Sequence, residues 1–320
     1  MNRLSRKTSD ANLRHRPVLL REVLENLLTS KSGIYFDATT GTGGHSEAIV
    51  SHLGSEGKLI CMDRDESLLE IAKKRLGKYR DKVKFAHLCF SQIKELVFSL
   101  KIKEISGFLF DLGVCSLHLD DPQRGFSFQS DGPLDMRMDP SQSKTASFVV
   151  NNYPLSDLTQ ILFEFGQEKF SKRIARAIVR QREKNKISTT FQLRKLVESK
   201  VNPRYRIKSL ARVFQAIRIE VNDELKELRE GLDQAIKLLA FQGRLCVISY
   251  HSLEHRIIKD MIKREAKGCV CPPDFPECLC GAKATLRMVT KKPMVPSVQE
   301  IEKNPRARSA KLWITEKLSF

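Results

Sequence analysis

Short apolar runs alternate with helical patterns through the first third of the chain. The apolar runs, which predict strands, occupy residues 34–39, 58–63, 83–90 and 105–112. The helical patterns between them begin near His45, Glu66 and Ser91. Asp65 precedes the second of these patterns, where its carboxylate can cap a helix by accepting an unpaired backbone N–H. The alternation is typical of a parallel sheet with crossover helices.

The alternation stops after the fourth strand. Residues 113–208 form a Gly/Pro/Asp-rich loop followed by helical patterns, with no convincing strand. A long helix is then expected from about Ala211, with apolar residues at intervals of three and four as far as Leu239. The sheet would be completed by a helix from about Leu253 and by strands at 244–250, 286–290 and 310–315.

These elements predict an α/β fold, with a doubly wound, mostly parallel, seven-stranded Rossmann-like domain and an inserted α-helical domain. The expected boundaries are 1–112 and 212–320 for the sheet domain and 113–211 for the insertion, which we expect to recognise the substrate. A chain of 320 residues is long enough for both domains, since domains usually span about 100 to 200 residues.

The chain is strongly basic. Its 56 lysines and arginines exceed its 38 acidic residues, and the net charge of +18 favours a polyanionic partner such as nucleic acid. No apolar run approaches the roughly 20 residues needed to cross a bilayer, and the polar start of the chain lacks the apolar stretch of a signal peptide. We therefore expect a cytoplasmic protein.

The most basic stretch lies in the predicted insertion. Residues 169–212 contain fifteen lysines and arginines and two acidic residues. Five of these cations follow one face of a predicted helix, at spacings of three and four: Lys169, Arg173, Arg176, Arg180 and Lys184. The opposite face is apolar and carries Phe170, Ile174 and Ile178. Such a stripe is either a solvated surface or a wall that binds phosphates, and its density favours the second interpretation.

A glycine-rich turn follows the first predicted strand. Residues 37–46 read DATTGTGGHS, so Asp37 comes before glycines at positions 41, 43 and 44. A structural turn or a dinucleotide site are alternatives, but a dinucleotide fingerprint needs a differently spaced third glycine, and a carboxylate would repel its pyrophosphate. Asp63 ends the second strand, where a carboxylate can accept both hydroxyls of a ribose. Together these residues favour S-adenosylmethionine over NAD.

The fourth predicted strand ends at Asp111, beside the place expected for a transferred methyl group. Its carboxylate could accept N–H groups of an amine that is being methylated, or it could only position the cofactor. Both interpretations stay open. Cys115 suggests covalent attack on a pyrimidine ring for carbon-5 methylation, but no neighbour in the sequence is suited to activate the thiol.

Four cysteines cluster near the end of the chain. They form two C-x-C pairs within twelve residues: Cys269, Cys271, Cys278 and Cys280. Such a set suggests a tetrahedral structural zinc, and free or redox-active thiols are an equal alternative.

Longer motifs resemble the bacterial 16S rRNA (cytosine-N4)-methyltransferase family, RsmH or MraW. The matching blocks cover nearly the whole chain, and the run from Asp111 to Asp139 is far more specific than a glycine motif. The blocks are HRPVL at 15–19, residues 37–46, DRD at 63–65, residues 111–139, KRIARAI at 172–178, and residues 214–225, 248–253 and 304–310.

The resemblance implies transfer of a methyl group from S-adenosylmethionine to a cytosine N4 amine of 16S rRNA, within the small ribosomal subunit or its precursor. It implies cofactor contacts from Gly43, Gly44, His45, Asp63, Phe90, Asp111 and His118, with Phe90 stacking on the adenine. The family usually has glutamine at His118, serine at Cys115, glutamate at Gln167, phenylalanine at Tyr250 and aspartate at His255.

Access to N4 requires an unpaired or flipped cytosine. Phe126, Phe128 and the loop 131–139 are candidate walls for its pocket, or else an ordered loop packed on itself. His45 and His251 are more simply interpreted as capping or packing residues. The alternative function is that of a non-catalytic RNA-binding ribosome-assembly factor. DNA methylation is disfavoured, because the D/S-P-P-Y/W motif of amino-methylating DNA enzymes is absent after the fourth strand. The sequence leaves open whether the protein forms a homodimer.

Overall fold

The computed structural model describes residues 17–268, 271, 280–281 and 283–318. The chain divides into two compact units. The sheet unit comprises residues 1–113 and 225–320, and the helical unit comprises residues 114–224. Of the helices in the described part of the chain, none is long and apolar enough to cross a membrane.

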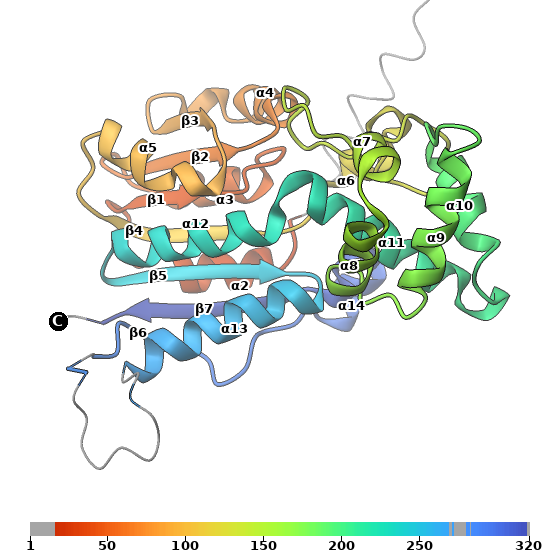
Figure 1. Ribbon diagram of the computed structural model, residues 1–320. Helices are drawn as coiled ribbons and strands as arrows, with labels where there is room; N and C mark the ends of the chain where they lie inside the picture. The colour runs from red at the N-terminus through yellow and green to blue at the C-terminus, as the bar shows by residue number, and fades with distance from the viewer. Residues whose placement is uncertain (1–16, 269–270, 272–279, 282, 319–320) are drawn as a thin grey trace, which may run out of the picture. The chain divides into compact units, whose positions relative to one another are not determined.

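The sheet unit is built on seven strands in the order β3-β2-β1-β4-β5-β7-β6 (Figure 1). Strands β1 to β5 run parallel, and β7 pairs antiparallel with both β5 and β6. The seven-stranded, mostly parallel sheet predicted from the sequence is therefore confirmed. The strands are β1 (Ile34–Asp37), β2 (Lys58–Asp63), β3 (Val83–His87), β4 (Ile105–Asp111), β5 (Leu239–Ser249), β6 (Leu286–Met288) and β7 (Lys311–Lys317).

Helices cover the sheet, with α12 and α13 in front of it and α2 behind it in the view of Figure 1. Asp65 caps α4 as expected, because its carboxylate accepts hydrogen bonds from the backbone N–H groups of Ser67 and Leu68. The helices are α2 (Leu20–Leu27), α3 (Gly44–His52), α4 (Glu66–Arg75), α5 (Ile93–Ser99), α12 (Glu224–Leu238), α13 (Ser252–Lys267) and α14 (Val298–Lys303), with 3₁₀ turns at Gly77–Tyr79, Phe90–Gln92 and Pro305–Ser309.

The chain order places a topological switch at the centre of this sheet. Strand β1 lies between β2 and β4, so the chain moves toward one edge through β2 and β3 and toward the other through β4 and β5. In open α/β sheets, ligands bind outside the carboxyl ends of the strands at such a switch. The ends of β1, β2 and β4 are therefore the first place to look for a site.

The helical unit has its own apolar core and contains no strand between residues 114 and 224, all of which are described. Ile174 and Ile178 are fully buried there, which confirms the apolar face predicted opposite the basic stripe. Its helices are α6 (Ser116–Asp120), α7 (Ala146–Asn152), α8 (Leu155–Glu164), α9 (Ser171–Arg182), α10 (Thr190–Glu198) and α11 (Arg206–Asn222), with 3₁₀ turns at Pro122–Arg124 and Pro203–Tyr205.

The single long helix expected from Ala211 to Leu239 is wrong, because the structure has two helices there. Helix α11 ends at Asn222, Asp223 adopts a left-handed conformation with φ of 50°, and α12 begins at Glu224. The apolar spacing continues through the break, so periodicity alone could not reveal it. The boundary between the units falls after Glu224, and most of the buried apolar side chains of α11 belong to the helical core.

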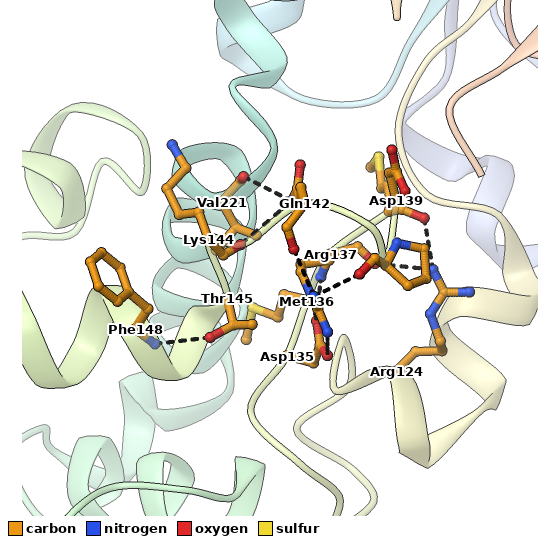
Figure 2. A network of polar contacts seen from close by, with 12 residues as sticks. Arg124, Asp135, Met136, Arg137, Asp139, Gln142, Lys144, Thr145, Phe148 and Val221 are labelled. Carbon is orange, nitrogen blue, oxygen red and sulfur yellow. Dashed lines mark hydrogen bonds and ion pairs between the residues drawn. The ribbon is translucent and has the colours of Figure 1, made fainter. Parts of the chain in front are cut away.

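The loop 124–142 is held by a dense polar network (Figure 2). Arg124 donates to the carbonyl oxygens of Arg137 and Met138 at 3.0 and 2.9 Å. The Arg137 guanidinium forms a bidentate pair with Asp135, at 2.7 and 2.8 Å, and donates to two further carbonyls. Met136 has a φ of 62°. The side chains of Arg124 and Arg137 therefore donate hydrogen bonds to other residues of the same loop.

Asn222 connects this loop to the end of α11. Its amide oxygen accepts from the Met138 N–H at 2.8 Å, and its amide nitrogen donates to the Met136 carbonyl at 2.8 Å. Asn222 is fully buried. Both backbone groups would lose their partner if this side chain were removed, so the loop conformation depends on it.

We expect Asn222→Ala to lower the free energy of unfolding by about 2 kcal/mol or more, since it leaves buried polar groups unpaired. Asn152→Ala is the matched control, because exposed Asn152 donates only to the carbonyl of Phe148 in its own helix, and we expect a loss of about 0.5 kcal/mol or less. Urea unfolding measures both variants. Equal, small losses would show that the loop does not depend on Asn222.

Candidate active site

Three carboxylates lie at the carboxyl ends of adjacent parallel strands. Asp37 ends β1, Asp63 ends β2 and Asp111 ends β4. The strand register aligns these ends, because Asp37 pairs with Cys61 of β2 and with Leu109 of β4, two residues before each of the other aspartates. The sheet thus concentrates negative charge at the switch point.

Asp37 is fully buried. Its Oδ2 accepts from the Ser46 hydroxyl at 2.6 Å, and its Oδ1 accepts from the Thr39 N–H at 3.1 Å. Burial raises the pKa of Asp37 to about 6, and the nearby Asp63 charge adds to this effect, although the two hydrogen bonds oppose it. Asp37 therefore fixes the turn to the start of α3.

The glycine turn requires glycine at two of its positions. Gly41 and Gly43 have φ angles of 52° and 83°, a region in which side chains are strained. A Cβ on Gly43 would also lie 3.2 Å from the Cβ of Ala72 in α4. At Gly44 a Cβ would come within 2.7 Å of Pro17. The turn is thus packed closely against its neighbours while its backbone faces the strand ends.

Asp63 holds this turn from the next strand. Its Oδ2 accepts from the Gly41 N–H at 2.7 Å, and its Oδ1 accepts from the Asp65 N–H at 2.9 Å. Asp63 therefore fixes the glycine turn to the end of β2, at the position where the sequence predicts a carboxylate that accepts the hydroxyls of a ribose.

Asp111 is held by groups from three segments. The Tyr250 hydroxyl donates to its Oδ1 at 2.7 Å, and its backbone N–H donates to the Thr39 hydroxyl at 2.6 Å. The His45 Nε2 lies 3.6 Å from its Oδ2. The Asp111 side chain is 19% exposed, so a ligand can still reach it.

Burial raises the pKa of Asp111 to about 7, and the charges of Asp37 and Glu254 add to this, while the Tyr250 hydrogen bond opposes it. The folded protein therefore holds a proton that the unfolded chain, with a carboxyl pKa of 3.8, would release. By this linkage, stability falls as the pH rises from about 4 to about 7. A bound cation would stabilise the charged carboxylate and so reduce this loss of stability.

Phe90 begins the 3₁₀ turn after β3 and packs edge-on against Phe110, with ring centroids 5.3 Å apart. Helix α12 holds this turn, since Glu227 accepts from the N–H and the hydroxyl of Ser91 at 2.9 and 3.1 Å. A Cβ on Gly231 of α12 would lie 2.5 Å from the Cβ of Phe90. Phe90 is half-buried, so stacking on an adenine remains a prediction for its exposed part.

The structure thus brings together Gly43, Gly44, His45, Asp63 and Asp111 in the sheet unit. His118 belongs to the helical unit, where it is buried and stacks on Phe126 with ring centroids 4.9 Å apart. Its cofactor contact stays a prediction. His251 caps α13 through a hydrogen bond with the Glu254 N–H, which confirms the capping interpretation.

Phe126 and Phe128 take part in the helical core. Phe126 is 5% exposed and belongs to the buried cluster, and Phe128 packs edge-on against Phe214 at 5.4 Å. Together with the polar network of residues 124–142, this packing favours the interpretation of an ordered loop packed on itself. It does not favour the alternative, in which Phe126 and Phe128 form free walls of a base pocket. Cys115 is partly buried directly before α6.

Only part of the cysteine cluster is described. Cys271 is partly buried and Cys280 is exposed, whereas Cys269 and Cys278 lie outside the described residues. The zinc site therefore stays a prediction. In the basic stripe, Lys169 precedes α9, Arg173, Arg176 and Arg180 lie on its exposed face, and Lys184 follows it.

The sequence alone does not indicate the residues that orient Asp111. In the sequence, Tyr250 stands out only as a departure from the family, and Thr39 only as part of the glycine motif. Tyr250 could have been found from its position directly after a buried strand, where side chains face the carboxyl edge of the sheet. Its neighbour Glu254 is 3% exposed and accepts from the Tyr250 N–H at 2.8 Å.

The sheet topology and the glycine turn at the switch point define a Rossmann-like domain of the doubly wound α/β class. The chain belongs to the MraW methylase family, whose model matches residues 12–318.

Relatives match over nearly their whole length. The "Ribosomal RNA small subunit methyltransferase H" of Carboxydothermus hydrogenoformans is 49% identical, over 96% of this chain and 98% of that protein. The protein of the same name from Caldicellulosiruptor saccharolyticus is 48% identical, over 95% and 99%. Among solved structures, a putative rRNA-methylase from Clostridium thermocellum matches with a TM-score of 0.44 at 9% identity, over 94% of this chain and 93% of that chain.

We expect Asp63→Ala to weaken S-adenosylmethionine binding by about 100-fold or more, because two ribose hydroxyls lose a charged acceptor. Calorimetry measures the affinity, and a melting curve checks the fold. Asp81→Ala, which removes an exposed carboxylate, is the control and should bind normally. An unchanged affinity of the Asp63 variant would contradict the assignment.

Proposed function

We propose that this protein transfers a methyl group from S-adenosylmethionine to the exocyclic N4 amine of a cytosine in 16S rRNA, acting in the cytoplasm on the small ribosomal subunit or its precursor. The observation that carries the proposal is the acidic edge formed by Asp37, Asp63 and Asp111, in a chain of the MraW methylase family. The names of the relatives support rRNA of the small subunit as the substrate.

The residues present fit the cofactor. Asp63 ends β2 beside the glycine turn, where its carboxylate would accept the ribose hydroxyls, and the turn of Gly41, Gly43 and Gly44 would permit close approach of the backbone to the cofactor. Burial raises the pKa of Asp37 to about 6 and that of Asp111 to about 7, so a ligand that brings positive charge would stabilise the charged carboxylates. When bound, S-adenosylmethionine supplies a methyl group on a cationic sulfonium.

Asp111 would act on the amine. The N4 lone pair is delocalised into the cytosine ring, so the amine is a poor nucleophile until it is oriented. The Asp111 carboxylate accepts an N–H of the amine, turns the lone pair toward the methyl group, and disperses the positive charge that develops on nitrogen. The new C–N bond would form as the bond between the methyl group and the sulfonium sulfur breaks, which leaves the neutral thioether of S-adenosylhomocysteine. The nitrogen would then release a proton, which the Asp111 carboxylate, a base whose pKa is raised by burial, can accept.

Tyr250 would keep Asp111 in place for this step. Its hydroxyl occupies Oδ1 at 2.7 Å, which leaves Oδ2, the oxygen 3.6 Å from His45, for the amine. Burial and the adjacent Asp111 raise the pKa of Tyr250 well above its usual 10, so the hydroxyl stays protonated and remains a donor. Tyr250 is thus a positioning residue.

The test is nucleoside mass spectrometry of 16S rRNA from cells with and without the gene. We expect N4-methylcytidine to fall when the gene is deleted, to return with the wild-type gene, and to stay low with Asp111→Asn. Asp81→Asn should restore it fully. Unchanged N4-methylcytidine in the deletion strain, or loss of a carbon-5 isomer instead, would contradict the proposed reaction.

A further inference from the structure

A groove on the helical unit is lined by α9, by the segment that follows α9, and by α10. Figure 1 shows α9 and α10 as neighbouring green helices. The groove has a volume of about 1240 Å³, and eight of its fifteen lining residues are lysine or arginine, while none is acidic. The cations are Lys172, Arg173, Arg176, Arg180, Lys184, Lys186, Lys195 and Lys200.

Four cations of the basic stripe, all but Lys169, lie in this groove. The second wall is formed by Lys195 of α10 and by Lys200 after it. Both lie in the basic stretch 169–212 but outside the stripe, and the packing of α10 beside α9 brings them to the groove. The two walls together surround a ligand with positive charge on more than one side. A stripe on a single solvated helix would have no such counterpart.

The eight cations of the groove have no acidic partner in the part of the chain that the structure describes. Among the described residues, no carboxylate lies within ion-pair distance of any of the eight. Elsewhere in the same unit cations are paired, since Arg194 lies 2.9 Å from Glu198 and Arg218 lies 2.8 Å from Glu224. Eight unpaired like charges repel one another, and a polyanion would offset that repulsion.

The other lining residues indicate what part of a polyanion fits. They are apolar or carry amide and hydroxyl groups: Ala177, Ile187, Leu196, Gln181, Asn185, Gln192 and Ser199. None of the described residues that line the groove is aromatic, so these residues offer no stacking platform of the kind that binds exposed bases. Amide and hydroxyl groups beside lysines and arginines are typical donors to phosphate and sugar oxygens.

We propose that the groove between α9 and α10 binds the sugar–phosphate backbone of an RNA strand without reading its sequence. This inference rests on the proposed function, because it takes the polyanion to be RNA. Phosphate contacts fix the position of an RNA without selecting bases. Recognition of the target cytosine is then left to other parts of the protein.

The test compares two groove variants with a matched control. Lys195→Gln with Lys200→Gln removes the α10 wall, and Arg176→Gln with Arg180→Gln removes two charges of the α9 wall. The control, Lys259→Gln with Lys263→Gln, removes two exposed charges from α13 of the sheet unit. The probes are oligouridylate and oligoadenylate of equal length, titrated at several salt concentrations, and melting curves check each fold.

We expect each groove pair to lower the slope of log affinity against log salt by about 1.4, since each phosphate contact on a single strand contributes about 0.7. Both probes should respond to the same extent, and the control should leave the slope unchanged. An unchanged slope in the α10 pair would overturn the two-walled groove. Losses confined to one probe would overturn backbone recognition.

Polyglutamate of matched charge, added as a competitor, tests whether the groove binds an acidic protein surface instead of RNA. Competition as strong as that of the oligonucleotides would overturn the RNA assignment. The nucleoside measurement separates this inference from the proposed function. If deletion of the gene removes N4-methylcytidine but the groove variants keep the salt slope of the parent, only the groove is contradicted. If the groove variants lower the salt slope but deletion of the gene leaves N4-methylcytidine intact, only the proposed reaction is contradicted.

Discussion

The convergence of three aspartates at one edge of a parallel sheet is the constraint on which the site depends. Strand register places Asp37, Asp63 and Asp111 together, and burial makes the charged forms of Asp37 and Asp111 costly. The protein offsets part of this cost with hydrogen bonds from Ser46, Tyr250 and the glycine turn. The part of the cost that these hydrogen bonds do not offset favours a ligand that brings positive charge.

The two units divide the electrostatics of the chain between them. The carboxylates of the sheet unit suit a cationic cofactor, whereas the unpaired cations of the helical unit suit a polyanion. Arg124 and Arg137 show that cationic residues in the helical unit can also be structural, because both are bonded to loop carbonyls. Net charge alone therefore could not identify the RNA-binding surface.

The sequence predicted the sheet, the cap at Asp65 and the positions of Asp63 and Asp111, because strand periodicity and chain order determine which residues end parallel strands. It could not predict the break at Asp223, since an apolar period continues across a single left-handed residue. It also missed the bond from Tyr250 to Asp111 and the α10 wall of the groove. Tyr250 and Asp111 are distant in the chain. Lys195 and Lys200 follow the stripe closely, but nothing in the local sequence records how α10 packs beside α9.

The acidic edge formed by Asp37, Asp63 and Asp111 should favour a cationic ligand. Proton release on ligand binding tests this claim most directly. Calorimetry in buffers of different ionisation enthalpy counts the protons released when S-adenosylmethionine or S-adenosylhomocysteine binds. Only the first carries a sulfonium, which should lower the raised pKa values of Asp37 and Asp111, about 6 and about 7. The account predicts that S-adenosylmethionine releases more protons than S-adenosylhomocysteine between pH 6 and 7. Equal release by the two ligands would contradict it.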